Sequence, residues 1–320
     1  MNRLLAWIPA VLALGLVAAF AQQTWYPHEG GQLHYRASAR FGLEPESMPA
    51  GWTFGRVSAV ATDSEGNLYA LQRGKTADPL IVFDPKGKYL HSWGKGLFGT
   101  PHGLRIDSAD NVWITDSSDH QVMKFNQQGE RLLTLGIKGK AGADEKSFNK
   151  PTDVSFARNG EFYVSDGYGN SRIVKFSADG KYLMAWGTHG SGPGEFSTPH
   201  SVAVDTTGSV YVCDRDNNRI QIFDASGKFL KQWTHLGCAL SMVITPKDDA
   251  WVLAFRTETE GEASEWLAGR IMHIDLATGK ILGSMESPGH HIAASVNGDL
   301  FSASLTGNVI RWTPGWPEKK

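Results

Sequence analysis

Residues 199–233 read "PHSVAVDTTGSVYVCDRDNNRIQIFDASGKFLKQW", which contains four short segments that alternate apolar with polar residues or are rich in β-branched and aromatic residues. Turns containing Gly, Asp or Asn separate these segments. Successive side chains of a β-strand point to opposite faces, and such turns are typical of hairpins. The stretch therefore predicts four antiparallel strands joined by hairpins.

The same pattern recurs along the chain. Clear copies of its first half occupy residues 57–74, 101–118 and 151–168, and each is followed by a second hairpin. Two weaker copies begin with "LSMVITPKDDAWVLAFR" (240–256) and "GHHIAASVNGDLFSASL" (289–305). Six four-stranded units at a period of roughly 40 to 50 residues predict an all-β fold, a six-bladed β-propeller.

The region before the first copy has two predicted parts. Residues 1–21 combine a basic residue, an apolar run and an Ala-x-Ala ending, which predicts a signal peptide and an exported protein, secreted or periplasmic. An uncleaved membrane anchor is the alternative, because the run approaches the length of a bilayer span. Residues 22–54 form an N-terminal segment in which "GQLHYRAS" (31–38) is expected to supply the outer strand that the last copy lacks. The propeller itself is expected to occupy residues 55–320.

Composition excludes several classes of partner. The 320 residues carry a formal net charge of −2 without a long Lys/Arg cluster, so we expect no nucleic acid partner. No second hydrophobic span follows the N-terminal one, and we expect no membrane contact beyond a possible N-terminal anchor. Only two cysteines are present, which argues against a disulfide-stapled scaffold. We expect a monomer.

Three histidines occupy one position of the repeat. His102, His200 and His290 lie at the start of the predicted first strand in units two, four and six. Alternate blades of a six-bladed ring are about 120° apart, and first strands line its axis, so the three imidazoles converge at one height. Such a set suits Zn²⁺ with a fourth position open for chemistry. The alternative is that they pack as neutral polar residues at the channel mouth.

Several motifs carry a resemblance to a known family. They are "PHGL" (101–104), "KPTDV" (150–154), "VSDGYGNSRIVKFSADGK" (164–181), "GPGEFSTPHS" (192–201) and "DRDNNRIQIF" (214–223). The blades resemble the NHL repeat, and the chain resembles peptidyl-α-hydroxyglycine α-amidating lyase. Members of that family cleave a C-terminal α-hydroxyglycine to an amide and glyoxylate. For this protein the resemblance implies the same reaction, on that group or on a related α-hydroxy-amide. The resemblance implies that His102, His200 and His290 bind zinc, that Tyr168 is the catalytic base, and that Arg73 and Arg215 are active-site arginines.

The repeat places the same residues together independently. Arg73 and Arg215 fall at the end of the predicted second strand in units one and four, which is the mouth where the histidines begin the first strand. An Arg fork pairs with a carboxylate, so we expect a small-molecule or peptide substrate with a terminal carboxylate. Nearby guanidinium and zinc charges would favour the phenolate of Tyr168. The roles of the two arginines stay undivided, and a turn Arg paired with Asp or a merely packed Tyr is the alternative.

The chain also departs from the family pattern. His291 stands where the family has a calcium-binding Asp, so we expect this calcium site to be lost. Whether His290 or His291 is the third ligand is open at this point. Gly169 replaces a family cysteine, which removes that disulfide, and Cys213 and Cys238 are either bonded to each other or two thiols.

A second function from a different class remains open. An exported NHL propeller can bind a protein or saccharide through its faces without catalysis, and fold alone does not decide between the two. The coincidence of three histidines, one tyrosine and two arginines at one mouth favours the enzyme.

Overall fold

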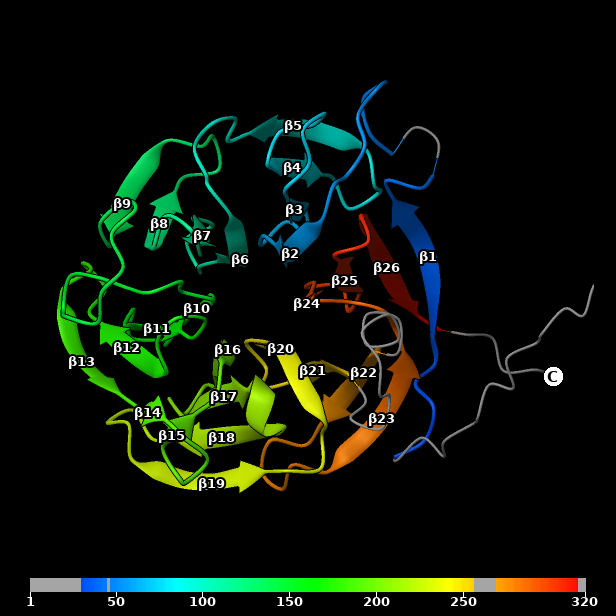
Figure 1. Ribbon diagram of the computed structural model, residues 1–320. Helices are drawn as coiled ribbons and strands as arrows, with labels where there is room; N and C mark the ends of the chain where they lie inside the picture. Colours follow the sequence, from blue (N-terminus) through cyan, green and yellow to red (C-terminus); the bar gives the residue numbers. More distant parts are fainter. Residues whose placement is uncertain (1–29, 45–46, 256–268, 316–320) are drawn as a thin grey trace, which may run out of the picture.

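The computed structural model describes residues 30–44, 47–255 and 269–315. They form six four-stranded antiparallel sheets arranged as blades around a central channel (Figure 1). The predicted fold class is therefore confirmed. The predicted signal segment, residues 1–21, lies outside the described residues. Within the described residues, no helix has the length and apolar character that a bilayer span requires.

The strands follow the repeat closely. Blade one contains β2 (Val57–Thr62), β3 (Leu68–Gln72), β4 (Leu80–Phe83) and β5 (Tyr89–Trp93); blade two contains β6 (Pro101–Ile106), β7 (Val112–Asp116), β8 (Gln121–Phe125) and β9 (Arg131–Leu135). Blade three contains β10 (Asp153–Phe156), β11 (Phe162–Asp166), β12 (Arg172–Phe176) and β13 (Tyr182–Trp186); blade four contains β16 (Pro199–Val204), β17 (Val210–Asp214), β18 (Arg219–Phe223) and β19 (Phe229–Trp233). Blade five contains β20 (Cys238–Ile244), β21 (Ala250–Phe255), β22 (Gly269–Ile274) and β23 (Ile281–Glu286). A short parallel pair, β14 (Thr188–His189) and β15 (Glu195–Phe196), precedes blade four, and a 3₁₀ turn spans Arg215–Asn217.

The sixth blade joins the two ends of the chain. It contains β24 (His291–Ala294), β25 (Leu300–Ser304) and β26 (Asn308–Pro314), and its outer strand is β1 (Tyr35–Phe41). β1 runs antiparallel to β26, with Tyr35 opposite Pro314 and Phe41 opposite Val309. The outer strand therefore overlaps the second half of the stretch 31–38 and ends a few residues after it. A propeller closed in this way has no free sheet edge at the junction of its first and last blades.

The hydrophobic core is divided among the blade interfaces. Six clusters of buried apolar residues lie one between each pair of neighbouring blades. Second strands such as β11 and β17 are buried along their whole length, because both of their faces pack on neighbouring blades. Packing on both faces fixes the angle between blades. It also fixes where the innermost strands present their side chains.

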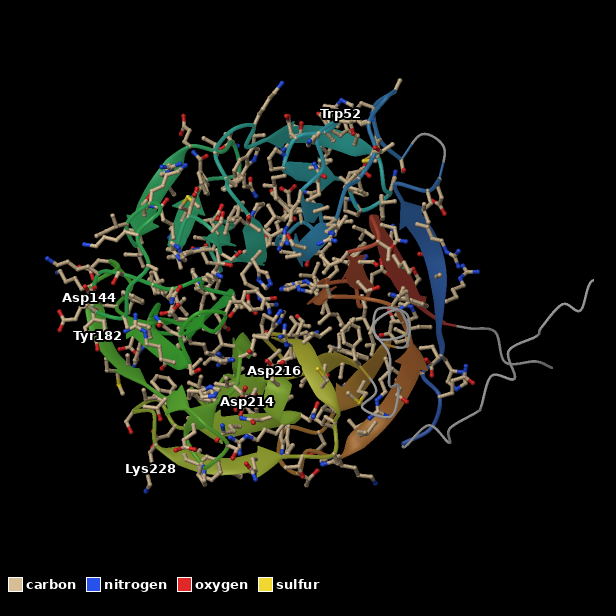
Figure 2. The ribbon with its side chains drawn as sticks, viewed as in Figure 1. Trp52, Asp144, Tyr182, Asp214, Asp216 and Lys228 are labelled. Atoms are coloured by element: carbon tan, nitrogen blue, oxygen red, sulfur yellow. The ribbon has the colours of Figure 1, made fainter. Side chains whose placement is uncertain are left out.

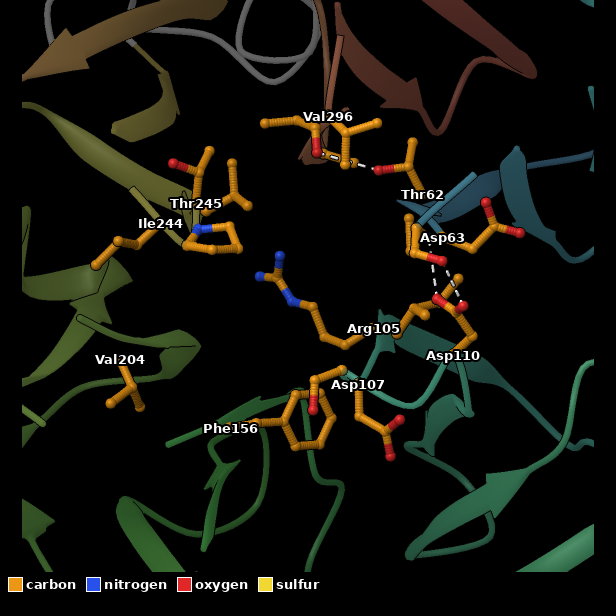
Figure 3. A pocket seen from close by; sticks show the side chains of 18 of the residues that line it. Thr62, Asp63, Arg105, Asp107, Asp110, Phe156, Val204, Ile244, Thr245 and Val296 are labelled. Atoms are coloured by element: carbon orange, nitrogen blue, oxygen red, sulfur yellow. Dashed lines mark hydrogen bonds between the residues drawn. The ribbon is translucent and has the colours of Figure 1, made fainter. Parts of the chain in front are cut away.

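Arg105 occupies the channel axis below the histidines. Its guanidinium donates to both carboxylate oxygens of Asp153 (3.0 and 2.6 Å), to Ser201 Oγ (3.3 Å) and to the Met242 carbonyl (2.9 Å), so it links blades two to five. The side chain points into a cavity of about 430 Å³ that residues of all six blades line at the mouth opposite the histidines (Figure 3). This network separates the cavity from the histidine mouth.

Candidate active site

The three predicted histidines meet in the channel. One ring nitrogen each of His102, His200 and His290 lies within 4.8 Å of the others, and all three side chains are buried. Their ring centroids are 4.9 to 5.0 Å apart, which makes a nearly equilateral triangle. His290, not His291, completes it, because the side chains of neighbouring residues point to opposite faces.

The backbone fixes the tautomer of each imidazole. The Nδ1 atoms of His102, His200 and His290 lie 2.7 Å from carbonyl oxygens of the following blades, those of Thr152, Leu240 and Ser58 respectively. A carbonyl only accepts, so each Nδ1 carries the proton and each Nε2 keeps a lone pair. An outer hydrogen bond of this kind orients histidine ligands in metal sites.

Burial keeps the imidazoles neutral. It lowers the pKa of His290 to about 4 and the pKa values of His102 and His200 well below the usual range of histidine. Repulsion from the neighbouring imidazoles lowers the pKa values of His102 and His200 further. Neutral imidazole is the form that binds a metal, so the cluster can hold a borderline ion such as zinc without first losing protons.

Hydroxyl groups on the alternate blades position the strands that carry two of the histidines. Ser58 Oγ donates to the Pro101 carbonyl at 3.0 Å, and Thr152 Oγ1 donates to the Pro199 carbonyl at 2.8 Å. Each proline directly precedes a histidine. Thr152 thus contacts both neighbouring blades. Its carbonyl accepts from the His102 ring, and its hydroxyl donates to Pro199 at the start of β16. Ser58 and Thr152 occupy in blades one and three the repeat position that the histidines occupy in blades two and four, but the sequence gives no signal for this contact, because one partner is backbone.

Tyr168 reaches the cluster from the turn after β11. Its hydroxyl lies 2.9 Å from Nε2 of both His102 and His200, and it donates to one of them at a time. The residue is 36% exposed, yet its hydroxyl end is enclosed by the buried imidazoles. Burial raises the pKa of Tyr168, and the charges of Arg215 and Arg73 act in the opposite direction. The effect of burial is the larger, so the charges of the two arginines alone do not favour the phenolate. The phenolate was expected from the arginines and zinc together.

The two arginines have different surroundings. Arg215 lies over the Tyr168 ring, 5.5 Å from its centroid, and its Nε donates to Asp216 at 2.7 Å. Asp216 lies near the inner end of blade four (Figure 2). Arg73 donates through Nε to the Pro101 carbonyl at 2.8 Å and has no carboxylate partner among the described residues. Arg73 is thus a half-buried cation that pairs with none of the carboxylates in the described part of the chain. The pairing of Arg215 with Asp216 is the turn pairing of an arginine with an aspartate that the sequence offered as the alternative.

The structure also shows the surroundings of His291 and of the two cysteines, where the sequence departs from the family pattern. His291 is buried, accepts a hydrogen bond from the Val60 amide through Nδ1 at 3.5 Å, and has a lowered pKa because of burial and the nearby charge of Arg105. Arg105, which was not singled out from the sequence, stands between the apolar residues Leu104 and Ile106 of an inner strand, and that interruption was the available signal. Cys213 and Cys238 are both thiols.

Comparison with known proteins agrees with the propeller fold. A family model described as "6-bladed beta-propeller" matches residues 141–287, and an "NHL repeat" model matches residues 98–125. The probable peptidyl-alpha-hydroxyglycine alpha-amidating lyase of Caenorhabditis elegans is 36% identical over 284 residues, which cover 78% of this chain and 80% of that protein. The chain belongs to the peptidyl-α-hydroxyglycine α-amidating lyase family. The predicted family is therefore confirmed.

Other relatives differ in length and name. The peptidyl-glycine alpha-amidating monooxygenase of Mus musculus is 38% identical over 229 residues, and the match spans 23% of that protein. NHL repeat-containing protein 3 of Mus musculus is 38% identical over 180 residues, 52% of each chain. Among solved structures, a streptogramin B lyase superposes with a TM-score of 0.59 at 16% identity over 88% of this chain, which shows the fold alone. The names of the lyase relatives support a lyase-like activity.

Proposed function

We propose that this protein is a zinc-dependent carbon–nitrogen lyase. Its substrate would be a C-terminal α-hydroxyglycine or a related α-hydroxy-amide, and its products an amide and glyoxylate. The observation that carries the proposal is the triangle of three neutral, backbone-oriented imidazoles with a tyrosine hydroxyl 2.9 Å from two of them. A packed polar core would not require three lone pairs to face each other.

The donor set fits zinc. His102, His200 and His290 would hold the ion through Nε2, and three nitrogen ligands leave a position for substrate. When bound, zinc supplies Lewis-acid chemistry, which lowers the pKa of a coordinated hydroxyl and also favours the phenolate of an adjacent tyrosine. This added charge offsets the burial that raises the pKa of Tyr168.

The surroundings of the arginines divide their roles. Arg73 has no carboxylate partner among the described residues, so it is the group available to bind the carboxylate of the substrate. Arg215 is already paired with Asp216 and lies over the ring of Tyr168, so it positions the tyrosine and stabilises its charged form.

Tyr168 then moves one proton. As the phenolate it removes the proton of the α-hydroxyl, and the electron pair of that O–H bond forms the carbonyl of glyoxylate as the carbon–nitrogen bond breaks. The same proton passes from Tyr168 to the departing nitrogen, which leaves as a neutral amide. Atoms and charge balance, and no other reactant is required.

A second candidate is supported by one observation. NHL repeat-containing protein 3 is 38% identical over half of this chain, and its name carries no catalytic activity. A non-catalytic propeller that binds a protein or saccharide would keep the fold and would have no need of Tyr168 beside the histidines.

The experiment is an assay of glyoxylate release from α-hydroxyhippurate. The purified protein is stripped with a chelator, assayed, and assayed again after one equivalent of zinc is added. We expect release to be lost and then restored. A His102→Ala variant that releases glyoxylate as fast as the wild type, or a zinc-loaded wild type that releases none, would exclude the proposal.

A further inference from the structure

A pocket of about 360 Å³ opens beside Tyr168, between blades three and four. Its walls are the turn between β11 and β12, His189 of β14, and Ser197 and Thr198 before β16. Apart from glycine and Tyr168, every residue that lines it carries a polar side chain. Tyr168 lines this pocket and also contacts His102 and His200, so the pocket lies next to the proposed site of reaction.

The wall that carries His189 is firmly held. Arg219 is buried, pairs with Asp214 at 2.7 Å, and donates to three backbone carbonyls of residues 191–195 at 2.7 to 2.9 Å. Asn217 donates to the Gly190 carbonyl at 2.8 Å. A buried ion pair that also donates three hydrogen bonds to one loop fixes that loop, so the position of His189 is built into the fold.

Three polar groups of the pocket are available to a ligand. Within the described part of the chain, the imidazole of His189 and the hydroxyls of Ser171 and Ser197 make no hydrogen bond. By contrast, Thr198 Oγ1 is bonded to Asp216 at 2.6 Å and Asn170 Nδ2 to Asp166 at 2.7 Å. The available groups thus offer donors and acceptors from both walls of the pocket.

The direction of the substrate follows from the proposed function, on which this inference rests. The reacting carbon bears a hydroxyl, a carboxylate, a hydrogen and the acylated nitrogen. The hydroxyl faces the histidines, and the carboxylate faces Arg73 on blade one. Blades one and four face each other across a six-bladed ring, so the acylated nitrogen projects toward blades three and four, past Tyr168.

We infer that this pocket is the acyl subsite and that it selects a polar residue on the amino side of the scissile bond. An apolar residue there would make no hydrogen bond to His189, Ser171 or Ser197, whereas a polar residue can bond to them. A small polar residue of a peptide satisfies one or two of them. The substrate class is therefore a peptide or N-acyl compound whose penultimate residue carries a hydroxyl or amide.

The test compares N-acetyl-threonyl-glycine with N-acetyl-valyl-glycine. The two differ by a hydroxyl in place of a methyl group, and neither is cleaved because the glycine lacks an α-hydroxyl. Binding is measured by calorimetry on the zinc-loaded protein. For one net hydrogen bond we expect the threonyl compound to bind about fivefold more tightly.

Variants of the pocket test which residues produce the preference for the threonyl compound. His189→Ala and Ser197→Ala are each expected to reduce it to less than about twofold, because each removes a bonding partner. His91→Ala, an exposed histidine on the outer strand β5, is the matched control and keeps the wild-type preference. Glyoxylate release from N-acetyl-α-hydroxyglycine, whose acyl group is too small to fill the pocket, is measured on each preparation.

The outcomes separate this inference from the proposed function. Normal glyoxylate release with equal or reversed preference for valine would overturn the acyl subsite alone, as would a preference that both pocket variants retain. Absence of binding by either dipeptide together with absence of glyoxylate release would overturn the proposed function, and the subsite with it.

Discussion

Replacing Arg105 by leucine tests how the inner strands are held together below the site. The guanidinium makes two hydrogen bonds to Asp153, one to Ser201 and one to the Met242 carbonyl. The Asp153 side chain is only 2% exposed, so removal of Arg105 leaves its carboxylate buried without a counter-ion. Breaking a buried pair from one side costs about 3–5 kcal/mol. We expect the free energy of unfolding to fall by about 3 kcal/mol, the lower end, because leucine recovers some burial.

Urea denaturation followed by tryptophan fluorescence measures this change. The double variant Arg105→Leu/Asp153→Asn is expected to recover at least half of the loss, because the uncompensated charge is gone. Arg158→Leu is the control: Arg158 is exposed at the same mouth with one hydrogen bond of 3.3 Å, and we expect a change within about 0.5 kcal/mol. A single variant as stable as the wild type, or a double variant as unstable as the single one, would refute the reasoning.

Three further predictions concern the site and its cysteines. Tyr168→Phe is expected to lower kcat for glyoxylate release by about 100-fold or more while bound zinc is unchanged, and an unaltered kcat would remove Tyr168 from the reaction. Arg73→Met is expected to raise KM about 10- to 100-fold through loss of a charge-assisted bond, whereas Arg56→Met keeps the wild-type KM; equal values for both variants would contradict the assignment. Burial holds the pKa of the Cys213 thiol far above its usual range, so mass spectrometry is expected to find it unlabelled by iodoacetamide at pH 8.5 until the protein unfolds. Rapid labelling of native Cys213 would show that its surroundings are open.

The repeat made most of the fold predictable. A four-strand pattern that recurs six times specifies a ring, and a ring brings residues at one position of the repeat to one height. His102, His200 and His290 therefore meet although about 90 residues or more separate each from the next. The same logic placed Arg215 beside Tyr168.

Contacts that the repeat does not encode were not predictable. Each Nδ1 is held by a backbone carbonyl, and a carbonyl has no sequence signature. The choice between His290 and His291 depended on the direction of each side chain at the start of β24, and the altered residues before it obscured the register. The role of Arg105 depended on two side chains and one backbone carbonyl from three other blades, which no local pattern brings together.

The metal content of the purified protein tests the central claim most directly. Elemental analysis is carried out on the wild type and on His200→Ala, with His235→Ala, an exposed histidine outside the cluster, as the matched control. We predict one zinc per chain in the wild type and the control and none in His200→Ala. Zinc retained at full stoichiometry in His200→Ala, or no metal bound by the wild type after zinc is supplied, would contradict the account.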